Sequence, residues 1–258
     1  MGGRKGIDEF SALVNPKNGQ LVVSKGEMKK IVLQYCKDTL ANNEPEDQYK
    51  ELIEGKKKKV SSLLNLKDGS FRAKLKTFDK NLKKFKQSRK RGYDFLTKSG
   101  REFQIAVFKT CERMFREEKF PMSFNETILH MIFKGKGSRE VLGNNRFIHC
   151  KPWFPRTAEA LIVEDGMKGP LVSGSSIYQI GGQPGHRPEE LVFVLKSIIA
   201  LYRSREKMLL AQCYDVSKFF DKEMIEDAVL VCYKRGVDPK AIRLWYKLNN
   251  KTQKPAKI

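Results

Sequence analysis

The stretch LAQCYDVSKFFD, residues 210–221, decides how the rest of the sequence is interpreted. Together with Met208 and Leu209 it begins with an apolar run (208–216) that predicts a buried strand ending near the carboxylate of Asp215. The carboxyl ends of strands are where α/β architectures place ligands, and a buried carboxylate needs a partner. Mg²⁺ takes carboxylate and carbonyl oxygens, which Asp215 and the backbone of Val216 supply. The alternative is that an aspartate caps the following helix, which fits Asp221 better than Asp215.

A hairpin is predicted upstream of this stretch. TILHMIF (127–133) has the β-branched content of a strand, the Gly-rich KGKG turn (134–137) follows, and Arg146 opens the returning strand to Cys150. Lys134, Lys136 and Arg146 would therefore lie near one loop, where cations bind phosphate oxygens. A solvated turn is the alternative reading.

The segment IGGQPGHRPEE (180–190) combines glycines with His186 and Arg187 directly before a helix that Pro188 opens. Helix N-termini favour phosphate, so these residues are a candidate anion site, with an ordinary loop and cap as the alternative. The helix is expected to bury one apolar face, formed by Leu191, Val194, Leu195, Ile198 and Leu201. Residues 165–187 as a whole are rich in glycine and serine and are expected to form loops.

Positive charge is concentrated in one part of the chain. The 258 residues carry 51 Lys and Arg against 30 Asp and Glu, a net charge of +21, and residues 55–100 account for +13 of it. In that segment Phe71, Leu75, Phe78, Leu82 and Phe85 have helical spacing and predict one amphipathic helix ending at Gly92. The basic residues around it are candidate nucleic-acid contacts: Arg72, Lys76, Lys80, Lys83, Lys84, Arg89 and Arg91. A solvated face and a membrane surface are the alternatives.

Other helices are predicted from local signals. We expect one that runs from residue 26 to near Asn42 and Asn43 and one that begins at a Ser99–Glu102 capping box. Two more are expected, one over 222–235 ending at Gly236 and one that Asp238 caps and Pro239 opens. The polar residues 41–59 are expected to form a linker.

Composition excludes several classes of protein. No apolar run is long enough to span a bilayer, and the first residues have no signal-peptide pattern. The five cysteines are scattered, which argues against a disulfide framework or a zinc site. We therefore expect an intracellular protein, nuclear or cytoplasmic, that is not secreted and has no membrane partner.

Four blocks of this sequence, in this order, resemble the reverse transcriptase domain of non-LTR (LINE-type) retrotransposons. They are FPMSFNETILHMIFKGKG (120–137), NNRFI (144–148), YQIGGQPGHRPEELVFVLKSI (178–198) and CYDVSKFFD (213–221). The resemblance implies an α+β, mixed α/β fold, in which a helical extension precedes the fingers and the first part of the palm of a right-hand polymerase. The expected units are an N-terminal extension (1–54), a basic helical segment (55–98), fingers (99–187) and the start of the palm (188–258).

The resemblance also implies roles for single residues. Lys134 and Arg146, and less directly Lys136, would hold the triphosphate of an incoming dNTP. Asp215 would be the catalytic ligand of Mg²⁺. Ser217, Lys218 and Phe219 would lie under the triphosphate, with Phe220 as the gate against ribonucleotides. The implied partners are an RNA template and a DNA primer, which Gln183, His186 and Arg187 would meet.

Departures from the family pattern set the functional expectation. Asn145 and Phe147 flank Arg146 where a tyrosine and a proline are common, and Phe219 replaces the usual alanine. The second palm motif, with two adjacent aspartates, and the thumb are missing from this chain. Two-metal transfer needs both sets of carboxylates, so we expect a fragment that binds nucleic acid weakly and polymerises nothing. The alternatives are a non-catalytic basic nucleic-acid-binding protein and a structural or interaction protein.

Overall fold

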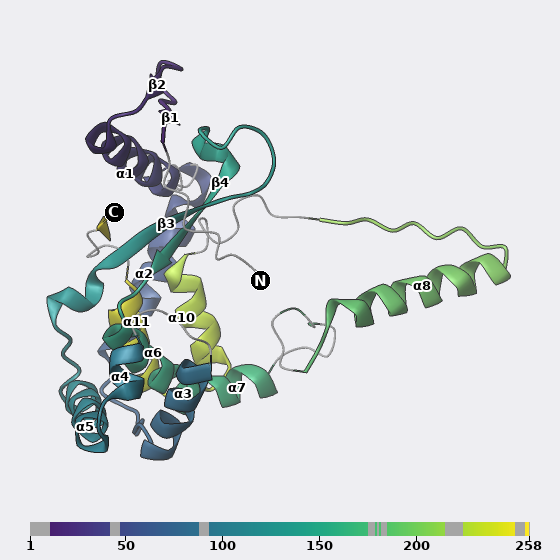
Figure 1. Cartoon of the computed structure of the whole chain (residues 1–258). Coiled ribbons are helices and arrows are strands. Elements are labelled where there is room, and N and C mark those ends of the chain that lie inside the picture. Colours follow the sequence, from purple (N-terminus) through teal and green to yellow (C-terminus); the bar gives the residue numbers. More distant parts are fainter. Residues whose placement is uncertain are drawn as a thin grey trace.

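The computed structural model describes residues 11–41, 47–87, 93–174, 179, 181, 185–214, 224–250 and 256–257. Within them the chain mixes helices with two small sheets, which confirms the α+β fold class (Figure 1). The helices are α1 (Lys25–Ala41), α2 (Asp47–Asn65), α3 (Leu75–Gln87), α4 (Asp94–Lys98), α5 (Arg101–Glu117), α6 (Trp153–Ile162), α7 (Lys168–Ser173), α8 (Pro188–Ser204), α10 (Ile225–Lys234) and α11 (Pro239–Asn249). The strands are β1 (Leu13–Val14), β2 (Leu21–Val22), β3 (Thr127–Phe133), β4 (Asn145–Cys150) and β5 (Ala256–Lys257). None of the helices described is long and apolar enough to cross a membrane.

A larger hydrophobic core is formed by the helices from α2 through α6 together with α10 and α11. Its fully buried side chains include Phe78 of α3, Leu161 of α6 and Leu244 of α11. A chain of aromatic rings, each 5.0–6.4 Å from the next, leads from the exposed Phe103 and Phe95 into this core. The rings belong, in order, to Phe103, Phe95, Trp153, Phe154, Phe124, Phe120, Phe115 and Phe71. This core is therefore built from residues that lie far apart in the sequence.

A smaller core lies between β1, α1 and the β3–β4 hairpin. Its five buried side chains are Leu13, Met28, Val32, Leu129 and Leu142. Tyr35 of α1 packs on Phe147 of β4, with ring centroids 5.5 Å apart. In the larger sheet β3 is central, with β4 antiparallel on one side and β5 parallel on the other.

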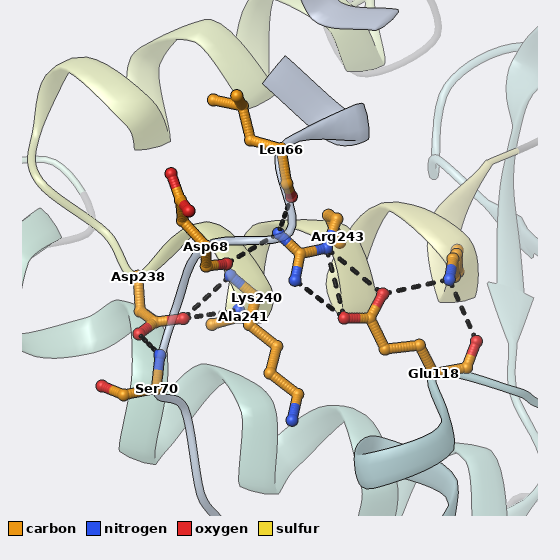
Figure 2. A network of polar contacts seen from close by, with 9 residues as sticks. Leu66, Asp68, Ser70, Glu118, Asp238, Lys240, Ala241 and Arg243 are labelled. Atoms are coloured by element: carbon orange, nitrogen blue, oxygen red, sulfur yellow. Dashed lines mark hydrogen bonds and ion pairs between the residues drawn. The ribbon is translucent and has the colours of Figure 1, made fainter. Parts of the chain in front are cut away.

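A buried arginine connects three segments of the larger core (Figure 2). The Arg243 guanidinium, on α11, donates to the Glu118 carboxylate at the end of α5 and to the carbonyl oxygens of Leu66 and Asp68 after α2. Lys247 adds a second cation on Glu118, 3.1 Å away. All the charge buried here is therefore paired, as burial of an ion requires.

The predicted start of the last helix is confirmed. Asp238 accepts hydrogen bonds from the backbone N–H groups of Lys240 and Ala241, and Pro239 occupies the first helical position of α11. The other Asp238 oxygen accepts from Ser70 N at 2.7 Å, which ties the cap to the segment before α3. Gly236, with φ +72°, ends α10 as predicted.

Residues 47–59, expected to belong to a linker, lie in a helix instead. They belong to α2, whose Val60 is buried in the larger core and whose Lys56 pairs with Asp227 of α10 at 2.7 Å. Lysine is a good helix former, so a polar run that packs on a neighbour becomes a helix. α2 also crosses residue 54, where the extension was expected to end.

The basic helix is shorter than predicted. α3 begins at Leu75, and Phe71 and Arg72 lie in the non-helical segment before it. The five apolar side chains therefore do not share one helical stripe, and Leu75 is exposed. The Asp165 carboxylate accepts from Lys74 N (2.8 Å) and Thr77 Oγ1 (2.6 Å), which fixes this helix start from a distant segment.

The expected Ser99–Glu102 capping box is also wrong. Ser99 ends α4 instead, with its Oγ donating to Leu96 O at 2.7 Å, and Gly100 is the N-cap residue of α5. Gln104 donates to the Leu96 and Ser99 carbonyls and closes the gap between the two helices.

The predicted loop over residues 165–187 is wrong as far as Ser173. A π-helical turn, Val163–Met167, joins α6 directly to α7. Gly166 is required there because an added Cβ would lie 2.6 Å from the Ala241 Cβ and 2.8 Å from the Phe71 ring. The glycine thus permits close helix packing rather than a loop.

Two predictions of burial are wrong. α8 begins at Pro188 as expected, but it extends away from the body of the protein and buries no side chain (Figure 1). The five apolar side chains predicted to be buried have exposed fractions between 38% and 49%. Residues 208–214, expected in a buried strand, form no strand and leave Leu210 90% exposed. An apolar sequence is buried only where another element covers it, and within the described residues none covers these.

Candidate nucleotide and nucleic-acid interface

The β3–β4 hairpin has two different faces. Strand pairs Ile132↔Arg146 and Met131↔Phe147 set its register. Because side chains alternate along a strand, Met131 and Phe147 point to the smaller core and Ile132 and Arg146 point away from it. The second face is exposed along both strands, with Ile128, His130, Ile132, Arg146 and Ile148.

Lys134 extends the exposed face toward the turn. Its backbone N–H donates to Asn144 O, so it continues the strand pairing by one position beyond Phe133. Its Nζ donates to Gly143 O at 2.8 Å, which holds the ammonium beside the hairpin. The structure thus brings Lys134 and Arg146, predicted as a pair, to one face.

Side-chain amides organise the loop between the strands. Asn145, buried, donates to the carbonyls of Arg139 and Val141, both at 2.9 Å, and Asn144 Nδ2 donates to Ser138 O at 2.8 Å. Gly135 and Gly137 have positive φ angles of 77° and 74°. Lys136 lies between these glycines, exposed, at the tip of the turn.

Arg146 is available for a ligand. Among the residues that the structure describes, its guanidinium makes no hydrogen bond or ion pair, and its side chain is exposed. Sequence reasoning missed His130, which lies on the same face and forms a strand pair with Ile148. The alternation of TILHMIF, in which Ile128, His130 and Ile132 share a face, is the signal that would have found it.

The predicted nucleic-acid contacts on α3 differ from one another. Lys76, Lys80 and Lys83 are exposed and spaced four and three residues apart, so they form one stripe. Lys84, by contrast, pairs with Glu164 at 3.2 Å. Burial favours the neutral acid at Glu164, but hydrogen bonds from Lys84 and Lys168 outweigh it and lower the pKa of this carboxyl. α2 adds exposed Lys57, Lys58 and Lys59, which the linker prediction had separated from any helix.

His186 and Arg187 are engaged at the start of α8. His186 Nδ1 lies 2.8 Å from the Glu190 carboxylate, and the Arg187 N–H donates to the same side chain. The hydrogen bond from His186 lowers the pKa of Glu190. A carboxylate already occupies this helix start, which weakens the expectation of an anion site there.

Several predicted site residues lie outside the described part of the chain. They are Asp215, Val216, Ser217, Lys218, Phe219, Phe220, Gln183, Arg89 and Arg91. Within the residues described, no three side chains of the metal-ligating types come together. Comparison with known protein families and with curated proteins finds no match to this chain.

Proposed function

We propose that this chain is the fingers and first palm segment of an RNA-directed DNA polymerase of the retrotransposon kind. The observation that carries the proposal is the exposed face of the β3–β4 hairpin, on which Lys134 and Arg146 lie together. An arginine that has no partner among the described residues, beside a lysine on a strand pair, is suited to the triphosphate of a dNTP. The four sequence blocks and the net charge of +21 support the same reading.

The two cations would bind the triphosphate in different ways. The planar Arg146 guanidinium offers two parallel N–H groups to one phosphate, and Lys134 keeps N–H donors beyond the one given to Gly143. Ile132, the strand partner of Arg146, and Ile148 give the face an apolar floor. His130 adds a further polar side chain on that face.

The proposed metal chemistry rests on sequence. Asp215 and the Val216 carbonyl are oxygen donors of the kind that Mg²⁺ binds, and bound Mg²⁺ would neutralise phosphate charge during nucleotidyl transfer. Ser217 to Phe220 would contact the nucleotide beside them. The chain contains no pair of adjacent aspartates, so we expect no DNA synthesis from this chain alone.

Binding of dATP to the whole chain tests the hairpin. Arg146→Ala is expected to weaken binding about tenfold, the loss of one charge-assisted contact. Lys29→Ala on α1 removes the same charge from an exposed position outside the hairpin and serves as the matched control. Equal dATP affinity in the Arg146 variant and the control would contradict the proposal.

Primer extension on an RNA template with Mg²⁺ tests the second part. No incorporation is expected. Incorporation that Asp215→Ala abolishes would refute the inactivity of the chain while supporting its family.

A second candidate function, non-catalytic binding of nucleic acid, is favoured by the α3 stripe. Lys76, Lys80 and Lys83 are exposed and make no ion pair within the described residues. This function predicts that charge reversal at Lys80 and Lys83 removes binding to an RNA–DNA duplex, while Asp215→Ala changes nothing. Each phosphate contact adds to the salt dependence of affinity; binding without salt dependence would instead indicate a structural or interaction protein.

A further inference from the structure

A pocket of about 420 Å³ lies between the segment before α3, α5 and the start of α11. Phe71, Ala73 and Phe115 form its apolar part, and Arg72, Glu112, Arg116 and Lys240 supply its polar groups. The neighbouring elements α3 and α5 lie at the end of the body opposite the hairpin tip (Figure 1). The pocket is therefore separate from the hairpin face, and no part of the proposed function rests on it.

The floor of the pocket is rigid. Phe71 and Phe115 are buried and meet edge to face, with ring centroids 5.8 Å apart. Gly166 packs so closely on the Phe71 ring that no side chain would fit between them. Phe115 also continues the aromatic chain of the larger core. Such a floor accepts a planar apolar body by stacking or edge contact.

The rim of the pocket has an excess of positive charge. Arg72, Arg116 and Lys240 face one acid, Glu112, and none of the four side chains makes an ion pair within the described residues. Asp238, the nearest capping carboxylate, is already bound by the N–H groups of Ser70, Lys240 and Ala241. Figure 2 shows the Lys240 side chain extending away from that carboxylate. The cations are thus left for a ligand.

We propose that this pocket binds a nucleotide unit, that is, a phosphate monoester carrying a planar base. Two guanidinium groups and an ammonium match a doubly charged phosphate. The phenyl floor takes the base, and Glu112 accepts from an amino or hydroxyl group, which a bare polyanion lacks. The volume lies in the range of small-ligand sites. The unit comes from a free mononucleotide or from the 5′ end of a nucleic-acid strand.

Calorimetric titration of the whole chain with AMP tests the pocket. Arg116→Ala and Lys240→Ala are each expected to weaken AMP binding about tenfold. The control is Arg113→Ala, which removes the same charge from the same helix, α5, at a residue that pairs with Glu117 outside the pocket. The AMP affinity of this variant should stay within twofold of that of the unchanged chain. Adenosine and inorganic phosphate, each lacking half of the contacts, should both bind more weakly than AMP.

Ala73→Phe separates a pocket from a merely basic surface, because it fills the space and keeps every charge. It is expected to abolish AMP binding. Arg116→Glu, at an exposed helical position that tolerates substitution, should do the same and guards against misfolding of the filled variant. AMP affinity that Ala73→Phe leaves within twofold, or no binding of AMP at millimolar concentration, would overturn the proposal.

A 5′-phosphorylated oligoadenylate distinguishes the two sources. Tighter binding than AMP that Ala73→Phe removes assigns the site to a strand end. Equal affinity for the two probes assigns it to the free nucleotide.

Discussion

The Arg243 guanidinium lies 2.8 Å from the Glu118 carboxylate (Nη2 to Oε1), although 125 residues separate the two in the sequence. The pair joins the end of α5 to the middle of α11, and the same guanidinium holds the backbone after α2 through Leu66 and Asp68. Three segments that no local signal connects therefore depend on one side chain.

Arg243→Ala is expected to lower the free energy of unfolding by about 3 kcal/mol, because it leaves two carbonyls without their donor and the Glu118 carboxylate with Lys247 alone. Urea unfolding followed by circular dichroism measures it. Arg113→Ala breaks an exposed i,i+4 pair with Glu117, which solvent screens, and should lower the free energy of unfolding far less. Similar decreases in the free energy of unfolding for the two variants would show that the buried pair stabilises the fold no more than the exposed pair does.

Stability should fall in acid partly through Glu118. Burial favours its neutral form, but hydrogen bonds from Arg243 and Lys247 outweigh burial and lower the pKa of Glu118 in the folded chain. This stabilisation is complete above the ordinary glutamate pKa of about 4.3 and is lost as the pH falls through the lower folded value. Unfolding measured across that range should show a smaller pH slope in Glu118→Gln. An unchanged slope would contradict the assignment.

Gly137→Ala should destabilise the hairpin loop more than Gly135→Ala. Both glycines have positive φ, so each alanine carries a backbone cost of about 1–2 kcal/mol. An added Cβ at Gly137 would also lie 2.5 Å from Asn144 Nδ2, whereas at Gly135 nothing lies within 4 Å. The difference between the melting temperatures of the two variants measures the cost of the clash with Asn144. Equal decreases in melting temperature would contradict the loop geometry.

Two phenylalanine-to-alanine substitutions should differ sharply in their effect on the free energy of unfolding. Phe78 is fully buried in the larger core and Phe193 of α8 is 72% exposed. Phe78→Ala is expected to cost about 3–5 kcal/mol and Phe193→Ala no more than about 0.5 kcal/mol. A comparable loss at Phe193, measured by urea unfolding, would mean that α8 packs on another surface in solution.

Much of the fold could be predicted where the signal is local. Gly236 marks the end of α10, and Asp238 and Pro239 mark the start of α11, because a cap acts on its own backbone. The alternation of 127–133 indicates the hairpin for a similar reason. Local chemistry sufficed at these positions.

Prediction failed where a distant partner decides the outcome. α2 is helical because Val60 finds the core and Lys56 finds Asp227, neither of which a polar run reveals. The start of α3 depends on Asp165, a residue expected in a loop. Leu195 and Leu210 lie in stretches whose apolar pattern is typical of buried elements, yet both side chains are exposed. Burial requires another element that covers the apolar face, and the local pattern does not show whether one is present.

The candidate site was predicted in part. Residue type and order predict Lys134 and Arg146 as phosphate ligands, but their common face follows from the strand register, which the loop from Gly135 to Asn144 sets. The AMP pocket could not be found in advance, since Phe71, Arg116 and Lys240 meet only in the folded chain. The contribution of Asp215 stays a prediction.

The division of the protein into two hydrophobic cores implies two levels of local stability. The smaller core has five buried side chains, so the hairpin that it supports should exchange its backbone amide hydrogens before α5 or α11 do. Lys134 and Arg146 thus belong to the part that opens at the lower free energy. A ligand that reorders the hairpin would then have to overcome only the opening of this small unit, while the helical part stays folded beneath it.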